Sequence, residues 1–114
     1  MKENVIANKS YAFAIKIVEL NKKLIQQNEY VLSKQILKSG TSIGANVEEA
    51  IGGISKRDFR AKMSIAYKEA RETSYWLKLL KDTNYITEDQ FNELHKNLLE
   101  ILKILFRIIE SSKT

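Results

Sequence analysis

Five basic side chains recur at helical spacing between residues 57 and 78, a pattern typical of a surface that binds phosphate groups. On an α-helix they fall within about 80° of arc. These residues, called the basic stripe below, are Arg57, Arg60, Lys68, Arg71 and Lys78. The stripe is about 30 Å long at the helical rise per residue, and Tyr75 lies within it. An array of cations of this length can follow a sugar–phosphate backbone without reading base sequence. The stripe therefore predicts contact with RNA or DNA.

Two other interpretations of the basic stripe stay open at this point. Any amphipathic helix carries charge on its outer side, so the stripe also fits a solvated face, and an acidic protein is a third possible partner. The formal net charge of +5 is modest for a nucleic-acid-binding chain. Its distribution is uneven, because residues 53–71 carry six cations against two anions.

A second set of polar residues follows one face of the segment before the stripe, with spacings of 4, 3, 4 and 3. These residues, called the polar seam below, are Gln35, Ser39, Ser42, Asn46 and Glu49. Short uncharged side chains dominate the set, which favours a partly buried hydrogen-bonding seam over a solvated flank. No nucleophile–base pair occurs in it, so no catalytic residue is predicted.

The chain offers little for metal or cofactor chemistry. It has no cysteine and a single histidine, His95. A di-iron centre in a helical bundle needs two Glu-x-x-His motifs, and Glu93 stands at the wrong spacing from His95. Gly52-Gly53 precedes a helix but lacks the spacing of a phosphate-binding glycine loop. We therefore expect no metal site, no cofactor and no enzymatic activity.

Four helices are predicted to position these residues. The apolar periodicity indicates helices over about 4–27, 30–51, 56–81 and 88–111. Ser55 and Thr87 are the expected N-caps of the last two helices, followed three residues later by Asp58 and Gln90. The chain has no proline, and its connections are short. We therefore expect one all-α domain over residues 1–114, an antiparallel up-down-up-down four-helix bundle.

The segment from Leu98 to Ile109 has a wider apolar surface than one bundle core needs. Its apolar arc is about 220°, whereas a helix on a single core needs about 100–140°. The first helix also carries two apolar faces, one through Tyr11 and Val18 and one through Phe13 and Ile17. This surplus predicts self-association into a homo-oligomer. The residues expected at the subunit contact are Phe13, Ile17, Leu20, Ile101, Ile104 and Ile108.

Two further expectations follow from the apolar pattern. Gly40 and Gly44 lie inside the second helix, where their spacing suggests that another backbone approaches closely. No signal peptide opens the sequence and no run of 18 or more apolar residues is present, so we expect a cytoplasmic protein with no membrane partner.

The segments LSKQILKSGTSIGANVEEAIGG, SKRDF, SIAYKEARETSYWL and TNYI resemble a bacterial family of small four-helix bundle proteins. This family includes the proteins encoded in intervening sequences of 23S ribosomal RNA genes. The residues that carry the resemblance are Gln35, Ser42, Ile43, Asn46, Val47, Glu49, Ala50, Ser55, Phe59, Ala66, Glu69 and Leu77. The resemblance implies a homopentamer. It also implies kinship with the basic accessory variability proteins of diversity-generating retroelements, which associate with nucleic acid and a reverse transcriptase. One departure is Lys38-Ser39, where the family is often more basic.

Together these observations favour a non-enzymatic, homo-oligomeric scaffold or accessory protein. Its basic stripe would contact nucleic acid or an enzyme that acts on nucleic acid. The alternative is a protein-only adaptor, in which the surplus apolar surface receives the amphipathic helix of another protein.

Overall fold

The computed structural model describes residues 4–113 and consists of four α-helices in this range. They are α1 (Val5–Gln26), α2 (Val31–Ile51), α3 (Lys56–Asp82) and α4 (Glu88–Ser111). No strand occurs within the described residues, which confirms the all-α class. Each helix bound lies within one residue of the position predicted from the sequence.

Side chains at the start of each helix satisfy backbone amides that have no partner inside the helix. Ser55 Oγ accepts a hydrogen bond from the Asp58 amide at 3.0 Å. Thr87 and Gln90 form the complete capping box, with bonds of 2.8 and 3.1 Å in the two directions. Both caps were predicted from the sequence and are confirmed.

The cap of α2 was not predicted, because its residue lies outside the usual cap position. Glu29 is buried, and its carboxylate accepts hydrogen bonds from the amides of Val31, Leu32 and Ser33 at 3.2, 2.8 and 2.9 Å. Asn28 directly before it has a φ of 62°, a left-handed conformation that asparagine tolerates better than most residues. This turn folds the Glu29 side chain back onto the helix start, where the helix dipole favours a negative charge.

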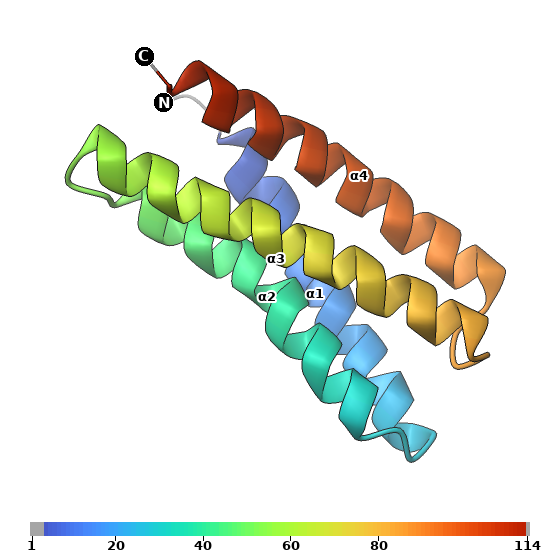
Figure 1. Ribbon diagram of the computed structural model, residues 1–114. Helices are drawn as coiled ribbons and strands as arrows, with labels where there is room; N and C mark the ends of the chain where they lie inside the picture. Colours follow the sequence, from blue (N-terminus) through green and yellow to red (C-terminus); the bar gives the residue numbers. More distant parts are fainter. Residues whose placement is uncertain (1–3, 114) are drawn as a thin grey trace.

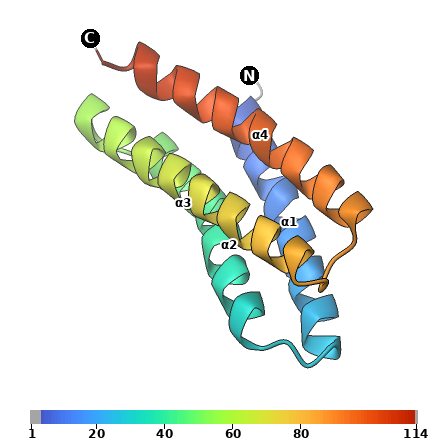
Figure 2. The same ribbon diagram turned by 45° about the vertical axis from the view of Figure 1, so that its right-hand side comes forward.

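Consecutive helices lie side by side: α2 packs against α1 and α3, and α4 packs against α3 (Figure 1). The α1–α4 contact is less extensive, and α4 runs obliquely to α1 in both views (Figures 1 and 2). The N-terminal end of α1 and the C-terminal end of α4 lie at the same end of the molecule. None of the four described helices is both long enough and apolar enough to cross a bilayer.

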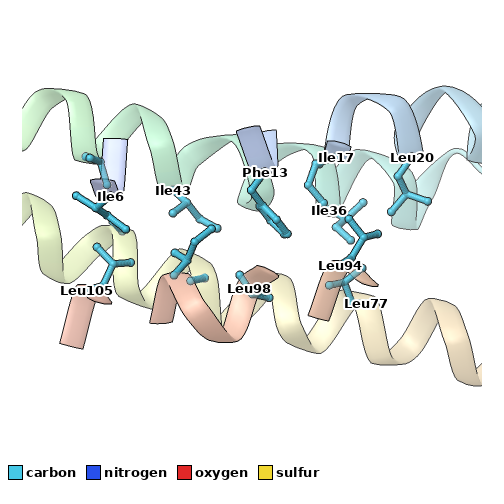
Figure 3. Packing of buried hydrophobic residues seen from close by; sticks show 14 of the residues in the cluster. Ile6, Phe13, Ile17, Leu20, Ile36, Ile43, Leu77, Leu94, Leu98 and Leu105 are labelled. Atoms are coloured by element: carbon cyan, nitrogen blue, oxygen red, sulfur yellow. The ribbon is translucent and has the colours of Figure 1, made fainter. Parts of the chain in front are cut away.

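All four helices contribute to one hydrophobic core (Figure 3). The largest side chains with less than 2% exposure include Phe13, Ile17, Ile36, Leu77 and Leu98. Gly40 brings α2 close to α1, because a Cβ at this position would lie 2.8 Å from Ile17 Cγ1. At Gly44 the nearest atom would be the Ser10 backbone oxygen, at 3.4 Å. The predicted close approach therefore involves a side chain at Gly40 and a backbone at Gly44.

The structure corrects the choice of subunit-contact residues. Phe13, Ile17, Leu20 and Ile101 are at most 5% exposed in the single chain, so they form its core and are not available to a neighbour. In α1 the face of Phe13 and Ile17 enters the core, where Ile17 fits against Gly40, and in α4 Ile101 is buried together with Leu98 and Leu105. Of the predicted contact residues, only two on α4 are left half-buried: Ile104 and Ile108.

Candidate nucleic-acid interface

The basic stripe lies along α3, beside α4. Arg57, Lys68, Arg71 and Lys78 are exposed, and Arg60 is half-buried. None of the five forms an ion pair with another residue in the range 4–113. The ion pairs of α3 use other cations, since Lys62 binds Glu49 at 2.9 Å and Lys81 lies 3.6 Å from Asp82. The positive charge of the stripe is therefore not neutralised within the described chain.

A surface groove between α3 and α4 runs beside the stripe. One part has a volume of about 550 Å³ and is lined by Arg71, Ser74, Tyr75, Lys78, Leu79, Asp82, Leu99 and Leu102. The other part has a volume of about 400 Å³ and is lined by Tyr67, Leu99, Leu102, Lys103, Phe106 and Arg107. Both parts are lined by Leu99 and Leu102, so they adjoin each other, and together they are called the α3–α4 groove below.

The α3–α4 groove adds two cations that the sequence analysis did not assign to the interface. Lys103 and Arg107 belong to α4 and line the part of the groove that contains Tyr67, whereas Arg71 and Lys78 of the basic stripe line the other part. Their spacing of four residues places them on one side of the helix. In the sequence this spacing shows only that they interrupt an apolar helix. Their nearness to the stripe depends on how α4 packs against α3.

Aromatic side chains stand among these cations. The rings of Tyr67 and Phe106 are 6.3 Å apart across the two helices. Tyr75 meets Trp76 edge to face at 5.0 Å. Tyr75 is 60% exposed and Phe106 is 52% exposed, so most of each side chain is open to solvent. The surface can therefore offer both charge and ring faces to a ligand.

His95 lies half-buried between α3 and α4, near the end of the groove. Its ring stacks on Phe91 at 4.8 Å, and its Nε2 lies 3.5 Å from Ser74 Oγ. Burial lowers the pKa of His95 from its usual 6.5, and the charges of Lys78 and Lys81 lower it further. Lys81 is held close by, with Nζ 4.4 Å from the centre of the Phe91 ring.

We expect this environment to make the protein less stable in mild acid. Because the pKa of His95 is lower in the folded state, the unfolded chain takes up a proton first as the pH falls below about 6.5. The free energy of unfolding should then decrease until the folded-state pKa is reached. Urea unfolding of the wild type and of His95→Gln between pH 7.5 and pH 5 checks this. The variant should lose part of the pH dependence, and identical slopes would contradict the expectation.

The polar seam lies where α2 packs against α3 and is only partly buried. Ser39 is buried, and its Oγ lies 2.9 Å from Thr73 Oγ1 of α3. Glu49 is exposed and pairs with Lys62 of α3. Ser42 and Asn46 are half-buried and bond to α2 carbonyl oxygens, and Gln35 is exposed. The structure therefore places a helix-to-helix hydrogen bond at one seam residue and an ion pair at another.

A separate apolar surface occurs on α1. Tyr11 is 68% exposed, and Ile15, Val18 and Ile25 are also exposed. These four residues, called the α1 stripe below, recur at spacings of 4, 3 and 7, which puts them on one side of the helix. Tyr11 and Val18 belong to the apolar face of the first helix that was not chosen for the subunit contact in the sequence prediction.

The fold and the basic stripe define a class of protein. It is a small four-helix protein with a basic face that the described residues do not neutralise. The chain belongs to the 23S rRNA-intervening sequence protein family, whose model matches residues 2–107. This confirms the resemblance seen in the sequence. The chain is also similar to a protein of unknown function from the S23 ribosomal protein family of Bacteroides thetaiotaomicron VPI-5482. That crystal structure is 52% identical, with a TM-score of 0.93 over 96% of this chain and 99% of that chain. A comparison with curated proteins finds no match.

Proposed function

We propose that this chain is a non-enzymatic accessory protein that assembles as a homo-oligomer and contacts nucleic acid, or an enzyme acting on nucleic acid, through its basic stripe. Its unit is an antiparallel up-down-up-down bundle, and its place is the cytoplasm. The observation that carries the proposal is the basic stripe itself, whose five cations lie on one side of α3 without an ion pair among the described residues.

Unpaired surface cations favour a polyanion for a specific reason. Unpaired cations that remain in water cost the folded chain no free energy. A phosphate backbone that binds these cations releases its condensed counterions. Each phosphate contact therefore adds affinity that depends on salt concentration and not on base sequence. A single chain with five such cations is expected to bind weakly. Several copies presenting the same face would bind more tightly through avidity.

Assembly is supported by the α1 stripe, an apolar surface that the single chain leaves uncovered. The proposed assembly is a homopentamer, as the family resemblance implies. A ring needs a head-to-tail contact, in which two different surfaces of the same chain meet. We propose that the α1 stripe is one of them, with Ile104 and Ile108 as the residues retained from the sequence prediction.

Removing the charge of the stripe tests the nucleic-acid contact. The variant Arg57→Gln, Arg60→Gln, Lys68→Gln, Arg71→Gln should bind labelled RNA and DNA at least about 10-fold more weakly at low salt. Its plot of log affinity against log salt should also be shallower, by about 3 for a single strand if all four cations engage phosphates. Fluorescence anisotropy at about 50 and 200 mM salt measures both quantities.

A control variant separates the stripe from net charge alone. Lys22→Gln, Lys23→Gln, Lys34→Gln, Lys96→Gln removes the same charge from exposed positions outside the stripe. It should keep most of the affinity. Equal losses in the two variants would mean that any surface cation serves, and that the stripe has no special role.

The second candidate function is the protein-only adaptor, favoured by the α1 stripe alone. An exposed apolar face on a helix can receive another protein's amphipathic helix. The adaptor would be monomeric when purified and would not bind nucleic acid, so the same binding measurement together with a molecular mass distinguishes it.

A further inference from the structure

We propose that the α3–α4 groove binds single-stranded nucleic acid, with unpaired bases against Tyr75 and Phe106 and phosphates at the cations of its two parts. This inference rests on the proposed nucleic-acid contact. It goes beyond that contact by naming the form of the ligand and the surface that distinguishes it.

Cations from both helices line the α3–α4 groove. Arg71 and Lys78 of α3 line one part of it, and Lys103 and Arg107 of α4 line the adjoining part. None of these four forms an ion pair with another described residue. The one acidic residue in the lining, Asp82, lies 3.6 Å from Lys81 Nζ. The groove is therefore a positively charged channel of the kind that holds a phosphate backbone.

The apolar surface of the groove is what selects a single strand. Leu99 and Leu102 are shared by its two parts, and the exposed rings of Tyr75 and Phe106 belong to one part each. A duplex keeps its base faces stacked inside, so a smooth basic face would suffice for it. A single strand exposes its base faces, and each base that stacks on an aromatic side chain raises affinity by about 5- to 150-fold.

Cations and aromatic rings also alternate along each helix, at axial offsets that suit a base and its neighbouring phosphates. Tyr75 stands four residues after Arg71 and three before Lys78, so the axial offsets are about 6 and 4.5 Å. Phe106 stands between Lys103 and Arg107 in α4. Each ring therefore has a cation on either side of it along its own helix. A base on the ring would place its neighbouring phosphates within reach of these side chains.

Charge disfavours the obvious competing occupant, a second copy of this chain. Its free apolar face is the α1 stripe, and α1 carries four lysines against one glutamate. Packing α1 into the groove would bring cations against cations. On the adjacent α2, Glu49 is already paired with Lys62, which leaves Glu48 as the remaining acidic side chain. A polyanion complements the groove better than another copy does.

The test compares labelled single-stranded and duplex DNA of about 12 nucleotides or base pairs by anisotropy at about 50 mM salt, a length chosen to span one groove. The wild type should prefer the single strand. Tyr75→Ala should weaken single-strand binding by about 5-fold or more and leave duplex binding unchanged. Tyr30→Ala, which removes a tyrosine of nearly equal exposure just before α2, should change neither. Phe106→Leu, which keeps an apolar side chain beside Tyr67, should reproduce the selective loss.

Three results would overturn the inference. Equal binding of both forms, with no effect of Tyr75→Ala, would leave the basic stripe as a duplex-tolerant phosphate surface and the proposed function intact. No binding of either form would overturn the proposed function as well. If Tyr75→Ala or Phe106→Leu instead lowers the mass measured by light scattering and spares single-strand binding, the groove is a subunit contact.

Discussion

Replacing Gly40 with alanine is expected to destabilise the protein by about 1–2 kcal/mol, whereas the same change at Gly44 should stabilise it by about 0.5–1 kcal/mol. Both residues lie inside α2, so alanine brings the same gain in helix propensity at each. The difference comes from what the new methyl group would meet.

At Gly40 that methyl group would lie 2.8 and 2.9 Å from the two γ carbons of Ile17. These carbons are attached directly to the Ile17 Cβ, and the side chain is fully buried, so it cannot move aside freely. At Gly44 the nearest atom would be 3.4 Å away, an ordinary contact. Overpacking of this kind typically costs about 1–3 kcal/mol, which exceeds the gain in propensity.

Urea unfolding at one fixed protein concentration measures the free energy of unfolding for each variant. Ile17→Ala provides the matched background, because it removes the two carbons that the new methyl group would strike. Ile17→Ala alone should cost about 2–5 kcal/mol, and adding Gly40→Ala to it should then be neutral or stabilising. If Gly40→Ala is as stabilising as Gly44→Ala in the wild-type background, the close packing of α1 on α2 is incorrect.

Placing two carboxylates on the α1 stripe is expected to reduce the proposed homopentamer to single chains of 13.2 kDa. Ile15 and Val18 are 47% and 38% exposed, so Ile15→Glu, Val18→Glu should leave the core of the chain intact. In the assembly the same change would bury two unpaired charges, and each would cost several kcal/mol. Light scattering after size-exclusion chromatography gives the mass, and helical circular dichroism verifies the fold.

The matched control is Val31→Glu, Ile65→Glu, which adds the same charge at exposed apolar positions on α2 and α3. It should retain the mass of the wild type. An assembly that survives changes in the α1 stripe but not in the control would place the subunit contact on α2 and α3. A wild-type mass of one chain would refute the assembly and favour the adaptor.

Most of the secondary structure could be predicted because it depends on neighbours in the sequence. Ser55 and Thr87 cap their helices through hydrogen bonds from the amides of residues three positions later. Both partners of each bond therefore lie within four consecutive residues. Apolar periodicity likewise requires only one helix. Glu29 escaped prediction because its side chain reaches forward from a left-handed turn at Asn28, and the backbone angle there is not visible in a periodic pattern.

The candidate site could be predicted in part. The basic stripe belongs to one helix, so helical spacing was enough to place its five cations on one side of α3, where four are exposed and Arg60 is half-buried. Lys103 and Arg107 were seen only as interruptions in an apolar segment. Their place in the same groove as Arg71 and Lys78 requires two helices to be set side by side. No spacing within either helix contains that information.

By itself, the sequence determined the four helices, the caps of α3 and α4, the basic face of α3 and the family. Each of these depends on contacts within a few residues, or on the pattern of residues along the whole chain. Only the tertiary structure decided which of the two apolar faces of α1 enters the core. Amphipathicity allows either face, whereas the space that Gly40 leaves opposite Ile17 allows one. That choice leaves Tyr11, Ile15 and Val18 exposed to solvent, because a close-packed core has room for a single stripe from each helix.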